Sequence, residues 1–126
     1  MKVVVETSAA PQAIGPYSQA IKANGFLFIS GQIPLDPETG QMTAVDAVAQ
    51  TKQVMANLSA ILNAEGLSFA DVVKTTIYLT DLTDFSRVNE TYAEYFESAP
   101  PARATVQVGA LPKGAKVEID AIAAMR

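Results

Sequence analysis

The segment YSQAIKANGFLFISGQ (residues 17–32) contains two apolar-rich runs separated by Asn24-Gly25. Asn-Gly between two such runs is the strongest short signal for a two-residue β-hairpin. Because the turn fixes the register, four pairs of residues share one face of the hairpin. The pairs are Ala23 with Phe26, Ile21 with Phe28, Gln19 with Ser30, and Tyr17 with Gln32.

The opposite face of the hairpin carries Ala20, Leu27 and Ile29, so both faces are largely apolar. An antiparallel sheet with one solvated face alternates apolar and polar residues, and this hairpin does not. Large exposed apolar patches usually mark interfaces. The hairpin therefore predicts a sheet with helices on one side and a partner subunit on the other.

The remaining elements follow from hydrophobic periodicity. Residues 2–6 and 71–81 predict strands, as do 102–108 and 115–123, where β-branched and apolar residues alternate. An apolar repeat between Ala47 and Leu62 predicts a long helix that ends near Gly66. Asp84 is the expected cap of a second helix that Pro100-Pro101 stops. Its apolar stripe contains Phe85, Val88, Tyr92, Tyr95 and Phe96. The order predicts a single α+β domain over residues 1–126, a six-stranded sheet with two helices on one face.

Composition excludes several kinds of chemistry. The chain has neither Cys nor His, so thiol nucleophiles, thiolate metal sites and imidazole bases are absent. The net charge of −4, without a basic run, argues against nucleic acid as a partner. No segment predicts a signal peptide or a membrane span, so we expect a soluble, cytoplasmic protein.

Arg103 is the most distinctive candidate for function. It stands in PPARATVQV (100–108) with no acidic residue within five positions. Alternation places it with Thr105 on a polar face that points away from the core, and we expect Glu118 and Asp120 near that same face. Arg103 is then either a solvated or ion-paired strand residue, or a two-pronged ligand for a substrate carboxylate.

Four further candidates, Glu118 among them, also have two interpretations each. Glu118 is either a surface carboxylate or the best available base, since His is missing. Asn89 is either a helix-edge amide or a site residue, and Gly31 either ends a strand or lets a ligand approach the backbone. Tyr17 either packs its ring or reaches a ligand with its hydroxyl on the Ser30 face.

Three separated motifs resemble the RidA-type reactive intermediate (enamine/imine) deaminases, also called the YjgF family. They are GPYSQAI (15–21), SGQIPLDPETG (30–40) and PARATVQV with LPKGAKVEIDAIA (101–123), and the match runs essentially end to end. The resemblance implies a chorismate-mutase-like fold, with the last strand between the third and fourth. It also implies a homotrimer with the sheets facing inward and active sites between subunits.

The resemblance also implies an activity without cofactor or metal. Such enzymes hydrolyse 2-aminoacrylate, 2-aminocrotonate and their imines, released by pyridoxal-phosphate-dependent dehydratases, to 2-keto acids and ammonia. Arg103 matches the arginine that clamps the substrate carboxylate, and Glu118 the glutamate that positions water. Matches to residues lining the cleft are Tyr17, Ser30, Gly31 and Asn89. Thr105, a further expected substrate-binding residue, stands where the family often has Cys.

A second hypothesis is a trimeric ligand-binding, chaperone-like or regulatory protein that uses the same cleft but catalyses no reaction. Some relatives are described as ribonucleases or translation inhibitors, which the acidic balance disfavours. The presence of both Arg103 and Glu118 favours the enzyme, because binding a carboxylate does not require a second, acidic group.

Overall fold

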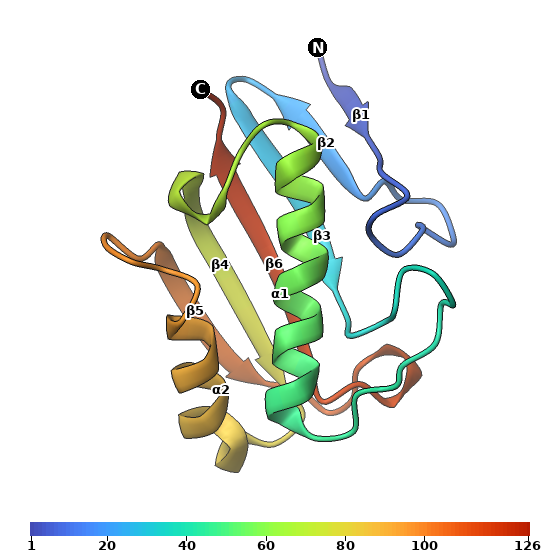
Figure 1. Cartoon of the computed structure of the whole chain (residues 1–126), viewed down its shortest axis with the longest axis vertical. Coiled ribbons are helices and arrows are strands. Elements are labelled where there is room, and N and C mark those ends of the chain that lie inside the picture. Colours follow the sequence, from blue (N-terminus) through green and yellow to red (C-terminus); the bar gives the residue numbers. More distant parts are fainter.

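The computed structural model describes residues 1–126 as one sheet with both helices on the same face (Figure 1). Its strands are β1 (Val3–Val5), β2 (Ala20–Ala23), β3 (Phe26–Gln32), β4 (Val72–Leu79), β5 (Ala102–Gln107) and β6 (Val117–Ala124). Their order across the sheet is β1-β2-β3-β6-β4-β5, and only the β4–β5 pair is parallel. The predicted α+β class, the mixed six-stranded sheet and the place of the last strand are all confirmed.

The hairpin has the predicted turn and register. Asn24 and Gly25 have φ angles of 52° and 81°, the left-handed pair that a tight hairpin turn requires. Ala23 pairs with Phe26 and Ile21 with Phe28, as expected. The side chains of Ala20, Leu27 and Ile29 are buried under the helices, whereas Phe26 and Phe28 remain 41% and 43% exposed on the other face.

The predicted pairing of Tyr17 with Gln32 is wrong. Pairing between β2 and β3 ends at Ala20 and Ile29, and the register of β3 against β6 shifts between Ile29 and Gln32. This irregularity inverts the alternation, so Gln32 is only 6% exposed. Gly31 instead faces Glu118, on the side of the sheet without helices.

Helix α1 (Ala47–Ala64) packs its apolar face on the middle of the sheet. The Asp46 carboxylate caps the helix by accepting from the Ala49 amide, and Gly66 follows the helix with a φ angle of 71°. The core beneath α1 contains the long side chains Val54, Met55, Leu58, Ile61 and Leu62, all at most 1% exposed.

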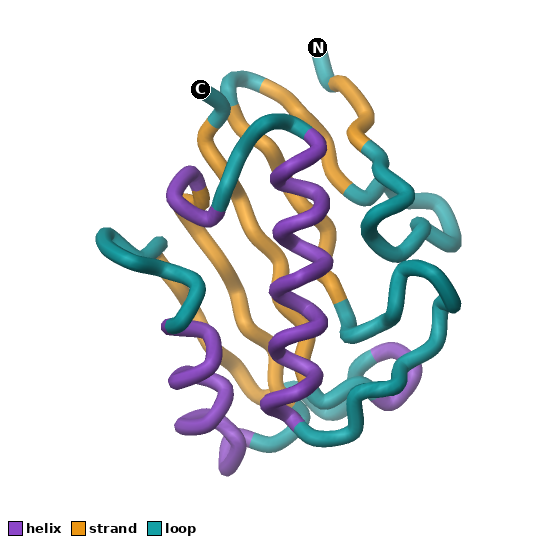
Figure 2. The backbone as a smooth tube through the Cα atoms, in the orientation of Figure 1, coloured by secondary structure: helices purple, strands orange, loops and turns teal.

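Helix α2 (Phe85–Ala93) is shorter than the apolar pattern suggests. It ends well before Pro100, and Tyr95 and Phe96 lie in the following turn, where both stack edge-on against Phe69. Asp84 stands at the predicted cap position but makes no capping hydrogen bond, since its carboxylate pairs with Arg87. Short 3-10 turns lie at Phe69–Asp71, Leu82–Asp84 and Pro112–Gly114, between longer elements (Figure 2).

Strand β5 faces the opposite way from the prediction. In its parallel pairing with β4, Arg103 lies beside Thr75 and Thr105 beside Ile77, and these two β4 residues are buried under the helices. Arg103 and Thr105 therefore project to the helix side. The polar face of β5 does not point away from the core, as alternation alone suggested.

We call the side of the sheet without helices the open face. On β6 the prediction is right, because Glu118 and Asp120 lie on the open face and Val117 and Ile119 are buried. The open face also exposes four large apolar side chains to between 41% and 56%: Val4, Phe26, Phe28 and Val106. No helix has the length and apolar character needed to span a bilayer.

Candidate active site

The candidate residues form two groups on opposite faces of the sheet. Arg103, Asn89 and Thr105 lie on or beside β5 and α2, on the helix side. Tyr17, Gly31 and Glu118 line a second pocket, on the open face. A single chain does not bring Arg103 and Glu118 together, contrary to the expectation that both lie near one face.

Arg103 is exposed and makes no ion pair. Its Nη1 donates to the Asn89 Oδ1 at 2.7 Å. The ion pairs of the chain are Lys22–Glu65, Asp84–Arg87 and Asp71–Arg126. Within one chain, therefore, Arg103 pairs with neither Glu118 nor Asp120.

The surroundings of the guanidinium are aromatic. Its carbon lies 5.2 Å from the centre of the Tyr92 ring and 5.7 Å from that of Phe85, within the range of cation–π attraction. A pocket of about 410 Å³ adjoins it, lined by Asn89, Tyr92, Ala93, Phe96, Pro100, Pro101 and Arg103. A positive charge at the edge of such a pocket suits an anionic ligand with a small apolar body.

Thr105 carries a buried hydroxyl with no hydrogen-bond partner. Buried polar atoms are nearly always paired, so this oxygen requires an explanation. Thr105 is two residues from Arg103 on the same side of β5. The unpaired hydroxyl is consistent with the ligand-contacting role that the family resemblance implies.

Glu118 is half-buried and sits against Gly31. A Cβ built on Gly31 would come within 2.2 Å of the Glu118 Oε2, so no other residue fits at position 31 without moving the carboxylate. The φ angle of Gly31 is ordinary, so the glycine serves close approach and not backbone conformation. The close neighbour of Gly31 is thus the Glu118 side chain, and the approach of a ligand to this backbone stays a prediction.

The pKa of Glu118 is raised, first by burial and second by the nearby negative charge of Asp120. Asp120 in turn accepts a hydrogen bond of 3.0 Å from the Tyr78 hydroxyl, and burial and this bond raise the pKa of Tyr78. A carboxyl group held closer to neutrality can both accept and donate a proton, as general acid–base catalysis requires.

The Glu118 pocket has a volume of about 410 Å³. Besides Tyr17, Gly31 and Glu118, it is lined by Pro11, Gln12, Ile14, Gln19, Gln32, Ile33, Leu35, Pro112 and Lys113. Tyr17 is 54% exposed, so its ring does not pack into the core. Ser30 lies nearby in sequence, but its hydroxyl is committed to the Ser18 carbonyl at 2.6 Å.

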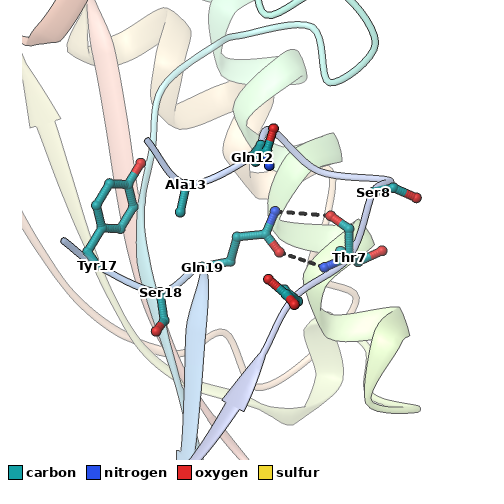
Figure 3. A pocket seen from close by; sticks show the side chains of 8 residues that line it. Thr7, Ser8, Gln12, Ala13, Tyr17, Ser18 and Gln19 are labelled. Atoms are coloured by element: carbon teal, nitrogen blue, oxygen red, sulfur yellow. Dashed lines mark hydrogen bonds between the residues drawn. The ribbon is translucent and has the colours of Figure 1, made fainter. Parts of the chain in front are cut away.

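Buried amides hold the loops around this pocket. Gln19 accepts from the Thr7 amide at 2.7 Å and donates to the carbonyls of Thr7, Ala10 and Pro11. Figure 3 shows these bonds to Thr7 in a second pocket, which shares Gln12, Tyr17 and Gln19 with the Glu118 pocket, and the Tyr17 side chain is turned away from Gln19. Asn57 of α1 donates to the carbonyls of Ile33 and Leu35. The pocket wall is thus fixed from within the core.

Three side chains in or beside these two pockets were not expected from sequence as site residues: Tyr92 and Lys113 line them, and Phe85 lies against the Arg103 guanidinium. Phe85 and Tyr92 belonged to the apolar stripe of the second helix, and nothing in that pattern distinguishes a ring under a guanidinium from a core ring. Lys113 lines the Glu118 pocket with a φ angle of 58°, which a sequence pattern does not reveal. No cluster of three or more His, Cys, Asp or Glu residues is positioned to hold a metal ion.

Fold and site together define a class: an α+β domain with an exposed arginine that makes no ion pair and a separate carboxyl group of raised pKa. The family model described as endoribonuclease L-PSP matches residues 7–125. Protein DfrA of Myxococcus xanthus is 62% identical, covering 94% of this chain and 92% of its own. The mouse 2-iminobutanoate/2-iminopropanoate deaminase is 50% identical, covering 98% and 91%.

Comparison with solved structures gives the same family. The crystal structure of E. coli TdcF with bound serine has a TM-score of 0.93 and 42% identity, and the match covers 98% of this chain and 99% of that one. The chain therefore belongs to the endoribonuclease L-PSP family, which includes the RidA-type deaminases. The predicted family and the predicted class of enzyme, an imine deaminase, are confirmed.

Proposed function

We propose that the protein hydrolyses 2-imino acids and their enamine tautomers, such as 2-aminoacrylate, to 2-keto acids and ammonia. The observation that carries the proposal is the separation of Arg103 and Glu118 onto opposite faces of the sheet. Each borders a pocket of about 410 Å³ that is open to solvent. Each group is half of a site for an anionic, hydrolysable substrate.

The two halves meet in a homotrimer in which the Arg103 side of one subunit lies against the Glu118 pocket of the next. The four exposed apolar side chains of the open face support such an assembly. A head-to-tail contact joins different surfaces of the same chain and closes into a ring when its rotation permits, as three subunits can.

Arg103 binds the substrate carboxylate. Only one of its N–H groups is used, by Asn89, so a two-pronged contact with a carboxylate remains available. The relative TdcF binds serine, an amino acid that carries such a carboxylate. The aromatic and proline residues beside Arg103 suit the short apolar part of a 2-imino acid.

Glu118 moves the protons of the reaction. A water oxygen forms a bond to the imine carbon, the C=N π electrons move to nitrogen, and Glu118 takes a proton from the water and delivers it to that nitrogen. Glu118 then carries the hydroxyl proton of the tetrahedral amino alcohol to its amino nitrogen, the C–N bond breaks with its electron pair going to nitrogen, and ammonia leaves as the C–O bond becomes the keto group. The sum is imine plus water giving ketone plus ammonia, with no redox step.

Because its pKa is raised, Glu118 keeps its proton to higher pH than an ordinary carboxyl group, which favours proton delivery as well as proton uptake. Because free imines already hydrolyse in water, positioning and one proton-transfer group are enough for a useful rate increase. The alternative is a trimeric protein that binds the same ligands without turnover. Nuclease activity is the weaker alternative, since the net charge is −4 and neither pocket is basic.

Substituting Arg103→Ala tests the proposal. An amino-acid oxidase generates the imine in situ, and ammonia or keto acid is measured with and without the protein. We expect the wild type to accelerate hydrolysis and Arg103→Ala to abolish the acceleration while light scattering shows an intact trimer. Arg87→Ala is the matched control, because Arg87 pairs with Asp84 outside both pockets. Undiminished activity of Arg103→Ala would refute the assignment, and no acceleration by stoichiometric wild type would favour the binding protein.

A further inference from the structure

We propose that Phe85 and Tyr92 are positioning residues that hold the Arg103 guanidinium in place for the substrate carboxylate. The inference deepens the proposed function and rests on it. The two rings and the Asn89 amide surround Arg103, and all three residues come from one face of α2. Their spacings of four and three residues align them along that face.

Tyr92 is the fixed part of this arrangement. It is 4% exposed, and its hydroxyl lies 2.7 Å from the Thr75 Oγ1. Thr75 is in turn the β4 residue directly beside Arg103. The Tyr92 ring is therefore fixed to β4, the strand next to β5, which carries Arg103. This contact joins α2 to the sheet.

Phe85 is the adjustable part. It is the first residue of α2, is 36% exposed, and its ring centre lies 5.7 Å from the guanidinium carbon. An arginine side chain has many rotamers, and ordering one costs free energy when a ligand binds. A guanidinium that already lies over two rings and donates to an amide loses less freedom on binding, which lowers KM for a carboxylate substrate.

A ring is needed for this role, and size alone is insufficient. A guanidinium is attracted to the face of an aromatic ring, and a lysine ammonium lacks the planar group that stacks on it. The effect of losing the Phe85 ring should therefore depend on whether Arg or Lys stands at position 103. A role of Phe85 in packing alone would not show this dependence.

The experiment compares Phe85→Leu, Phe85→Tyr and the control Leu82→Ala, an exposed apolar residue in the turn before α2. Kinetics with oxidase-generated imine and calorimetric binding of 2-oxobutanoate are measured on the assembled protein. We expect Phe85→Leu to raise KM and Kd roughly two- to fivefold with kcat nearly unchanged. Phe85→Tyr should restore wild-type values, and Leu82→Ala should not change them.

The cycle is completed in an Arg103→Lys background, where Phe85→Leu should have less than about half of its effect. Equal effects in both backgrounds, or no difference between Phe85→Leu and Leu82→Ala in an active enzyme, would overturn the inference and leave the proposed function standing. If the wild type neither hydrolyses imines nor binds 2-oxobutanoate, the proposed function fails and the inference fails with it.

Discussion

Replacing Gly31 by alanine adds one methyl group directly against the candidate acid–base residue. The new Cβ would lie 2.2 Å from the Glu118 Oε2, 2.8 Å from its Cδ and 3.2 Å from its Cγ. All three atoms belong to a side chain, so the carboxylate can move while the strands stay in place. Gly31→Ala therefore tests the position of Glu118 without changing its chemistry.

The size of the effect follows from these distances. Ordinary van der Waals contact begins at 3.4 Å, so Oε2 must retreat from 2.2 Å by about 1.2 Å. A misplacement of about 1 Å in a catalytic group can cost on the order of 100-fold in rate. The accompanying strain of an off-rotamer glutamate is about 1 kcal/mol, which lowers the melting temperature by a few degrees only.

The assay is kcat/KM for imine hydrolysis, with thermal melting and light scattering of the same samples. Gly109→Ala is the matched control, because a Cβ there meets nothing within 4 Å and the φ angle is not left-handed. We expect a loss of about 100-fold for Gly31→Ala and almost none for Gly109→Ala. If Gly31→Ala melts like the control and keeps activity within about twofold, Glu118 does not act from the position described.

Three further predictions use other residues of the two half-sites. Because Glu118 must be ionised to accept a proton, kcat/KM should fall as the pH drops through the raised pKa of Glu118. Asp120→Asn removes one cause of the raised pKa, so the acid limb of the pH profile should move to lower pH. An unchanged or upward-moving limb would contradict this. Thr105→Val removes a buried hydroxyl without a partner, so urea unfolding at fixed protein concentration should show a gain of about 1 kcal/mol; a loss would mean that the hydroxyl is paired in the assembled protein. Finally, refolding Arg103→Ala and Glu118→Gln chains together should restore activity in about one quarter of the clefts, whereas persistent inactivity of a mixed trimer would place both residues in one subunit's site.

The hairpin shows what local pattern predicts well. Asn24-Gly25 fixed the turn and the register because both residues accept left-handed φ angles that other side chains resist. The doubly apolar character of the same segment correctly indicated that Phe26 and Phe28 leave an exposed apolar face. Period and turn chemistry act over a few residues, so the sequence contains them directly.

At two points, the geometry of the site depends on more than these local patterns. The irregularity after Ile29 moved Gln32 into the core and turned Gly31 toward Glu118, and strict alternation cannot express such a shift. On β5, alternation correctly placed Arg103 and Ala104 on opposite faces of the strand. It did not predict which of the two faces points toward the helices. That direction depends on which strand is the neighbour and on the helix above the edge, which are both tertiary.

The separation of Arg103 from Glu118 has an electrostatic consequence. Had the two groups met in one chain, they would form an ion pair that lowers the pKa of Glu118 and occupies the guanidinium. Instead Arg103 rests against a neutral amide and two rings, so its charge stays uncompensated. Glu118 has a carboxylate, Asp120, as its charged neighbour, which holds its proton affinity high. If assembly joins the half-sites with a substrate carboxylate between them, that carboxylate neutralises Arg103. The charge of Arg103 then does not lower the pKa of Glu118. Within each chain, the separation thus preserves the two properties that the proposed reaction needs: an uncompensated arginine charge and a carboxyl group of raised pKa.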